Sequence, residues 1–324
     1  MKKTLLTVAL GVSAYGTYGK LKYGQSATSF LLEKSFRASG YKDRMRAEDP
    51  EKFGDSFTQA PDLDTFPARL LRVSKHREYQ VEGMQVFSWL EENSGKVILY
   101  LHGGGYVHRA SRLHYLMINR IGKLTNSKIV FPTYGLGPRN SLFTELPKIL
   151  VLYQQLVSER GAQNVVVMGD SAGGGLAVSL LQALRTEQLA MPGQAILLSP
   201  FVNAAMDHFQ TPYYDAVEPM ISIAALIRAG RCWVGEYHDL TDPLISPVNL
   251  PVEGVCGFPK ITSFVGTHEV FFPDIRDFHG LLSRGGVDNQ LIVGERMIHA
   301  YPVFPTPEGR AAQLQIAKLI NAGD

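Results

Sequence analysis

Apolar residues in the middle of the chain alternate between short continuous runs and longer runs with helical spacing. The short runs are rich in β-branched residues and are bounded by Gly or polar residues, which is typical of buried strands. The expected strands are 96–103, 128–134, 164–170, 194–201, 260–267 and 289–295. The expected helices are 111–125, 142–160, 172–188, 273–284 and 308–322. Strands that alternate with helices predict an α/β fold, with a mainly parallel sheet covered by helices on both faces.

Two stretches depart from this alternation. Residues from about 21 to 70 have a helix- and turn-like pattern, and residues 203–240 interrupt the rhythm between two strands. An insertion at the carboxyl end of a parallel strand lies over the crevice in which α/β proteins bind ligands. We therefore expect a single domain over residues 21–324, in which these two stretches form a helical cap.

The first 20 residues have a composition of their own. Lys2 and Lys3 precede an uncharged, largely apolar run from Thr4 to Gly19, which is the pattern of a secretory signal. The run is shorter than the roughly 20 apolar residues of a membrane span. A cleaved signal, a membrane tether and an apolar helix packed on the folded domain all remain open, and so does the choice between an exported or tethered protein and a cytoplasmic one.

Overall composition narrows the function. The chain has 324 residues, 45% of them hydrophobic, and a formal net charge of +2. Without a block of Lys and Arg, a nucleic-acid partner is not expected. Cys232 and Cys256 are too few for a disulfide framework and lack metal-binding spacing, so we expect no metal site. No residue pattern indicates an oligomeric state.

The segment Gly169-Asp170-Ser171-Ala172-Gly173 matches G-x-S-x-G between an expected strand and an expected helix. In this setting the serine occupies a strained turn that exposes its hydroxyl, and the flanking glycines relieve crowding there. The backbone N–H groups at the start of the following helix favour an anion beside that hydroxyl. The segment therefore predicts that Ser171 is a nucleophile.

A second glycine-rich segment, "LYLHGGGYVH" at 99–108, also follows an expected strand. Consecutive glycines leave backbone N–H groups free to face a substrate oxygen. We expect the N–H groups of Gly103, Gly104 and Ala172 to form an oxyanion hole. No G-K-[ST] follows the glycines, so a nucleotide-phosphate loop is not indicated, and His102 is expected to order the loop.

Together, HGGGY and, about 65 residues later, GDSAGGGLA resemble the signature pair of the hormone-sensitive-lipase-like branch of the α/β-hydrolase superfamily. The resemblance covers roughly residues 85–320. It implies an α/β-hydrolase fold with a cap, a catalytic triad in the chain order Ser, acid, His, and hydrolysis of short- to medium-chain carboxylic esters without a cofactor. "TYGLGP" at 133–138 departs from the YRLAP-like stretch that the family usually has there.

The remaining triad members follow from the order that the resemblance implies. His299 lies just after the last expected strand, where the family has its catalytic histidine. The acid belongs after the strand at 260–267, and the family pattern G-x-x-D places it at Glu269, although Asp is usual at that position. Asp274, five residues further on, is the alternative. A Glu can orient an imidazole as an Asp does if the backbone allows for one more methylene.

The sequence says least about the substrate. Tyr106, Phe201, Tyr213 and Tyr214 are candidates for the wall of an apolar pocket, and ordinary core packing would explain them equally well. The expected partner is a small-molecule ester. Two other functions stay open: a non-catalytic ligand-binding protein on the same fold, and an acyltransferase or amidase that uses the same site.

Overall fold

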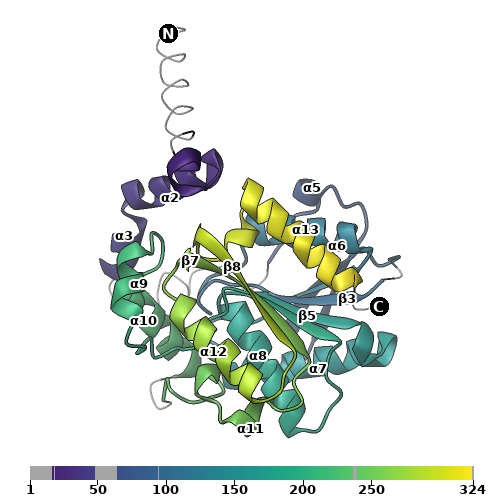
Figure 1. Cartoon of the computed structure of the whole chain (residues 1–324). Coiled ribbons are helices and arrows are strands. Elements are labelled where there is room, and N and C mark those ends of the chain that lie inside the picture. The colour runs from purple at the N-terminus through teal and green to yellow at the C-terminus, as the bar shows by residue number, and fades with distance from the viewer. Residues whose placement is uncertain (1–16, 18, 48–63, 94, 236–238, 323–324) are drawn as a thin grey trace.

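The computed structural model describes residues 17, 19–47, 64–93, 95–235 and 239–322. Its centre is an eight-stranded sheet in the order β1-β2-β4-β3-β5-β6-β7-β8 (Figure 1). The strands are β1 (His76–Val81), β2 (Met84–Trp89), β3 (Val97–Leu101), β4 (Lys128–Thr133), β5 (Val165–Asp170), β6 (Gln194–Leu198), β7 (Lys260–His268) and β8 (Asn289–Ile298). β2 is antiparallel to both β1 and β4, whereas the neighbours from β4 to β8 are parallel. The predicted α/β class with a mainly parallel sheet is confirmed.

Five long helices cover the sheet, and all five were expected from the sequence. They are α6 (Arg112–Thr125), α7 (Leu142–Arg160), α8 (Ala172–Thr186), α12 (Phe272–Arg284) and α13 (Pro307–Asn321). The buried side chains of β3 alternate between two hydrophobic clusters. Val97 and Leu99 belong to the cluster that contains α7, α8 and α12, and Ile98 and Tyr100 belong to the cluster that contains α6 and α13. The sheet is therefore buried on both faces, which explains why its strands are continuous apolar runs.

The β1–β2 hairpin was not expected from the sequence. Its two-residue turn, Glu82 and Gly83, has positive φ angles of 48° and 76°, as a tight hairpin turn requires. β1 lies at the edge of the sheet and most of its residues are exposed, so it lacks the apolar run that marks the other strands. An exposed edge strand of this kind carries little hydrophobic signal.

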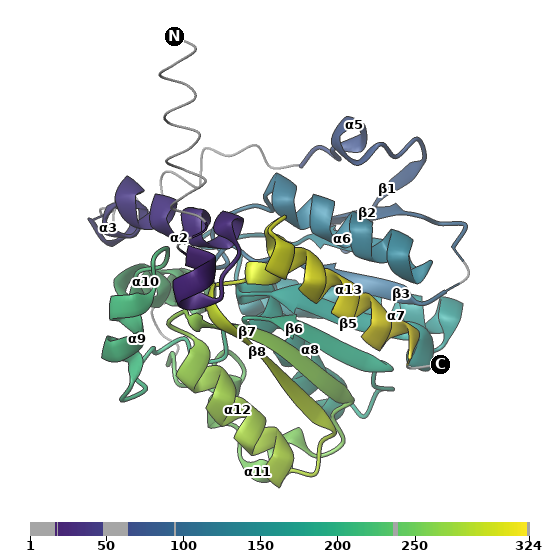
Figure 2. The ribbon, with the colours of Figure 1, turned by 45° about the horizontal axis from the view of Figure 1, so that its top comes forward.

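The two stretches that interrupt the alternation are helical. The first contains α2 (Ala27–Ser39) and α3 (Tyr41–Ala47), and the second contains α9 (Thr211–Val217) and α10 (Ile223–Val234). Figure 2 shows these four helices together at one end of the sheet. They contact one another directly, because Arg228 on α10 donates a hydrogen bond to the carbonyl of Met45 on α3 at 2.7 Å. The described chain also contains the short helices α5 (Ala68–Leu71) and α11 (Val252–Val255) and three single-turn 3-10 helices, Ala162–Asn164, Pro247–Asn249 and Tyr301–Val303.

Helix α2, near the N-terminus, packs on the C-terminal part of the fold. Ser26 caps α2 by accepting the N–H of Ser29 at 3.2 Å, and the Ser29 hydroxyl donates to Glu308 on α13 at 2.6 Å. Most of the expected signal or tether segment, residues 1–16 and 18, lies outside the described residues. Within the described ranges, none of the helices combines the length and the apolar character that a membrane crossing requires.

Candidate active site

Ser171 occupies a sharp turn between β5 and α8. Its φ of 50° and ψ of −122° are strained for a residue with a side chain, and its N–H is held by the carbonyl of Leu198 at 2.8 Å. The glycines on both sides are required by close packing. A Cβ added to Gly169 would lie 2.3 Å from the carbonyl oxygen of Gly173, and one added to Gly173 would lie 2.1 Å from that of Leu101. This is the strained turn that the sequence motif predicts.

His299 and Glu269 are brought together from the ends of neighbouring strands. His299 follows β8 and Glu269 follows β7, and the Nδ1 of His299 lies 2.8 Å from the Oε2 of Glu269 in a buried hydrogen bond. The other carboxylate oxygen, Oε1, accepts the hydroxyl of Ser199 and the N–H of Gly266, each at 2.9 Å. All these partners are donors, so the arrangement fits an ionised carboxylate facing Nδ1–H.

The electrostatic surroundings favour a basic imidazole. Burial alone would lower the pKa of His299, but the hydrogen bond and the charge of Glu269 outweigh it. The nearby carboxylates Glu218 and Asp170 act in the same direction, so the pKa of His299 lies above its ordinary value. With Nδ1 engaged by Glu269, the free nitrogen for proton transfer is Nε2.

Asp274, the alternative acid, lies elsewhere. It belongs to the first turn of α12, and its Oδ1 accepts a hydrogen bond from Asn203 at 2.8 Å. Burial raises the pKa of Asp274 to about 6. The structure thus brings Glu269, and not Asp274, to His299.

The glycine loop 102–105 differs in one respect from the expectation. The N–H of Gly103 donates to Oδ1 of Asp170 at 2.8 Å in a buried hydrogen bond, so this donor is already used. The prediction that Gly103 contributes to an oxyanion hole is therefore wrong. The next two glycines, Gly104 and Gly105, line the cavity that contains Ser171, and both have positive φ angles, 130° and 61°. Ala172 is the first residue of α8.

Asp170 anchors the glycine loop to the turn that carries Ser171. Besides Gly103, its carboxylate accepts the hydroxyl of Tyr100 and lies 3.2 Å from Nε2 of His114 on α6. Burial would raise the pKa of Asp170, but His114, Tyr100 and the N–H of Gly103 lower it to about 2. The loop histidine, His102, is also buried, and burial lowers its pKa to about 4. His102 is therefore neutral near pH 7, and its contacts with Gly103 and Tyr134 order the loop as expected.

A cavity of about 300 Å³ joins Ser171 and His299. Its lining combines apolar side chains with the polar side chains of His108, Arg109, Ser111 and His114. Both helical segments at this end of the sheet contribute to the lining, through Tyr41 and Met45 on α3 and through α10. The apolar wall includes Met45, Val107, Ile221, Ala225, Leu226 and Ala229.

The four aromatic residues proposed as pocket wall are not among the described residues that line this cavity. Tyr106 and Phe201 are buried and stack in the core, with ring centroids 6.1 Å apart. Tyr213 is 69% exposed, and the ring of Tyr214 lies against Phe272 on α12. The core-packing alternative describes Tyr106 and Phe201 correctly, because aromatic residues bury large apolar areas wherever they lie.

Sequence reasoning missed several residues of the site, and three of them show why. Ser199 directly follows β6 and donates to Glu269, while its Oγ accepts the N–H of Ala300 at 3.0 Å. A serine at the carboxyl end of a parallel strand was an available signal. Gly105 is the third glycine of the run 103–105, so the glycine-rich signal that indicated Gly103 and Gly104 applied to it as well. Met45 carried no signal, because only the packing of α3 against α10 brings it to the cavity.

Comparison with known proteins places this geometry in a family. The model of the alpha/beta hydrolase fold family matches residues 98–303. An acetyl-hydrolase of Streptomyces hygroscopicus is 29% identical over 225 residues, which are 67% of this chain and 73% of the relative. An esterase of Acinetobacter venetianus is 22% identical, over 83% of this chain and 85% of the relative.

Solved structures give the same fold. A protein from Staphylococcus aureus has a TM-score of 0.78 and 29% identity, over 84% of this chain and 92% of the other. An esterase of the bacterial hormone-sensitive lipase family has a TM-score of 0.75 and 23% identity, over 90% and 97%. The chain belongs to the alpha/beta hydrolase fold family. The predicted α/β-hydrolase family is therefore confirmed, and the resemblance of the paired glycine motifs to its hormone-sensitive-lipase-like branch stays a prediction.

Proposed function

We propose that this esterase-like α/β hydrolase cleaves short- to medium-chain carboxylic esters through an acyl-enzyme on Ser171. The observation that carries the proposal is the buried 2.8 Å hydrogen bond between His299 and Glu269, at a cavity that also contains Ser171. The names of the relatives, acetyl-hydrolase and esterase, support the same class of reaction. A nucleophile, a base and an orienting acid are the three parts that serine-dependent acyl transfer needs.

The mechanism begins when Nε2 of His299 takes the proton of the Ser171 hydroxyl as its oxygen attacks the ester carbonyl. Glu269 holds the imidazole and stabilises the imidazolium that forms. The N–H groups of Gly104, Gly105 and Ala172 bind the oxyanion. His299 then protonates the leaving alcohol, and afterwards it activates a water molecule that releases the acid and restores Ser171.

The size and the apolar wall of the cavity support a limit on the length of the substrate's acyl chain. Its volume of about 300 Å³ is at the small end of ligand sites, and its apolar wall suits an acyl chain. Helix α3 of the first helical segment and helix α10 of the second both line this cavity, so we infer that the two segments form its cap. A small-molecule ester with a short or medium acyl chain is therefore the proposed substrate.

The test is hydrolysis of p-nitrophenyl esters from acetate to dodecanoate, with Ser171→Ala as the matched variant. We expect turnover of the shorter esters and a loss of several orders of magnitude in kcat for the variant, since triad members act as a unit. Thermal unfolding of both proteins controls for folding. Equal turnover by Ser171→Ala, or none of any ester by the folded wild-type protein, would contradict the proposal.

A further inference from the structure

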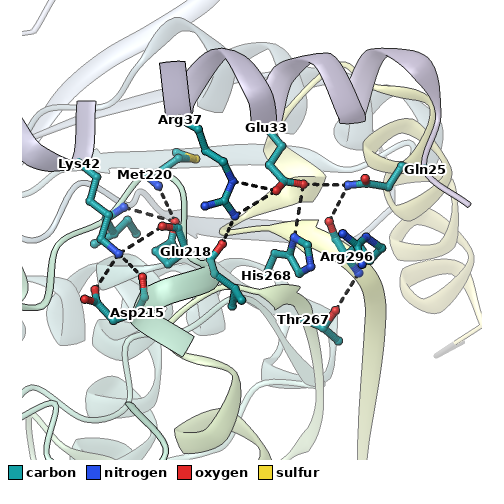
Figure 3. A network of polar contacts seen from close by, with 12 residues as sticks. Gln25, Glu33, Arg37, Lys42, Asp215, Glu218, Met220, Thr267, His268 and Arg296 are labelled. Atoms are coloured by element: carbon teal, nitrogen blue, oxygen red, sulfur yellow. Dashed lines mark hydrogen bonds and ion pairs between the residues drawn. The ribbon is translucent and has the colours of Figure 1, made fainter. Parts of the chain in front are cut away.

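Two buried carboxylates lie beside the triad without a part in the reaction described above. Glu33 on α2 and Glu218, directly after α9, are 3% and 1% exposed. They come from the two separate segments proposed as the cap. Figure 3 shows them in one network of polar contacts that runs along the underside of α2. Burying a carboxylate is costly unless donors surround it, so such groups call for an explanation.

Glu218 bridges the cavity wall and the turn of the catalytic acid. Its Oε1 accepts the N–H of Met220 at 2.7 Å and that of Ile221 at 3.3 Å, and both of these residues line the cavity. Its Oε2 accepts the N–H of Val270 at 3.3 Å. Val270 is the residue after Glu269, so a single side chain touches the wall of the pocket and the acid turn.

Glu33 contacts the same turn from its other side. Its Oε2 lies 3.3 Å from Nδ1 of His268, the residue before Glu269. It also accepts the amide of Gln25 at 3.2 Å, while Oε1 accepts Nε of Arg37 at 3.0 Å. Burial would raise the pKa of Glu33, but the contacts with His268, Gln25 and Arg37 lower it to about 2, so it is ionised at neutral pH.

We propose that Glu218 and Glu33 are positioning residues through which the two cap segments hold the turn that carries Glu269. The inference rests on the proposed function, because it assigns a role in orienting the same triad. Neither residue lines the cavity with Ser171, so both act through the neighbours of Glu269. The position of the cap and the alignment of the His299–Glu269 pair are thereby linked.

Charged groups from α3 and from the turns after β7 and β8 lie near Glu218. From α3, Lys42 donates to the main-chain carbonyl of Glu218 at 3.2 Å and pairs with Asp215 on α9 at 2.7 Å. Glu269 and His299 face it from the turns after β7 and β8. Burial raises the pKa of Glu218 to about 7 against the opposing effect of His299. Its negative charge in turn helps to raise the pKa of His299.

The variant Glu218→Gln distinguishes the contacts of Glu218 with the pocket wall, at Met220 and Ile221, from its contact with the acid turn, at Val270. If the amide oxygen keeps the N–H groups of Met220 and Ile221, the amide NH₂ faces the N–H of Val270, donor against donor. We expect kcat for p-nitrophenyl butyrate to fall by about tenfold to a hundredfold, because small displacements of catalytic groups have effects of this size. KM should change by less than about twofold, because the pocket wall stays in place. The acid limb of the kcat/KM profile should move to lower pH, because a negative charge near His299 is lost.

Asp43→Asn is the matched control, because Asp43 is an exposed carboxylate on the cap helix α3, and it should behave as wild type. A second readout is independent of turnover: the far-downfield proton resonance of the His299–Glu269 hydrogen bond should shift or broaden in Glu218→Gln. Wild-type kcat, pH profile and resonance in folded Glu218→Gln would overturn the proposal. Failure of the proposed function shows separately, as an inactive wild-type protein.

Glu33→Gln provides the second variant, and it decides the question if Glu218→Gln does not fold. If the amide oxygen keeps Nε of Arg37, the amide NH₂ faces the NH₂ of Gln25, donor against donor, and the negative charge beside His268 is lost. We expect a lower kcat with an unchanged KM and the same change in the downfield resonance. A folded Glu33→Gln with wild-type kinetics and an unchanged resonance would overturn the proposal.

Discussion

Glu269→Gln tests the core of the proposed mechanism, because it changes one atom and leaves the shape of the side chain. The carboxylate of Glu269 accepts three hydrogen bonds, from Ser199, Gly266 and His299. An amide supplies only one acceptor oxygen. If that oxygen keeps the two donors at Oε1, its NH₂ group faces Nδ1 of His299 and forces the proton onto Nε2. In that tautomer His299 cannot accept the proton of Ser171.

The magnitude follows from this exclusion of the productive tautomer. In the corresponding substitution of a serine protease, kcat falls by about 10⁴-fold while the geometry stays intact, and we expect a loss of the same order here. The assay is the initial rate with p-nitrophenyl acetate, with enzyme concentration set by amino-acid analysis and folding checked by thermal unfolding. Asp274→Asn is the matched control. Its amide can keep the bond from Asn203, so its kcat should stay within about threefold of wild type. A kcat for Glu269→Gln within tenfold of wild type would refute the reasoning.

Three further predictions follow from the same region. The acid limb of kcat/KM should lie above pH 6.5, because the base must be neutral and the pKa of His299 is raised; a limb below that value, measured with p-nitrophenyl acetate, would contradict it. Asp170→Ala should lower the free energy of unfolding by about 3 kcal/mol in urea titration, since it leaves buried donors of Tyr100 and Gly103 unpaired. The exposed variant Glu187→Ala should change it by less than about 0.5 kcal/mol. Ala225→Leu should narrow the cavity, so kcat/KM should fall more for octanoate than for acetate; an equal effect on both esters would exclude Ala225 from the acyl side.

The sequence predicted those parts of the site that local patterns determine. The strands β3 to β7 are apolar because both faces of the sheet are buried there. Ser171 is flanked by glycines because its turn leaves no room for Cβ atoms. The parts that it could not predict depend on contacts between distant segments. Gly103 differs from Gly104 and Gly105 in that its N–H is accepted by Asp170, 67 residues away. The cavity wall depends in the same way on how α3 meets α10.

The glutamate at the position of the acid is accommodated by features that lie outside the motif. The pairing of β7 and β8 shifts register between Gly266 and His268, which reshapes the backbone just before Glu269. The N–H of Gly266 and the hydroxyl of Ser199 then hold one oxygen of the longer side chain, so that the other reaches His299 at 2.8 Å. A shorter aspartate on this backbone would withdraw both oxygens by about one methylene, roughly 1.5 Å. We infer that Glu269 and Ser199 act as a unit, in which each determines how the other serves His299.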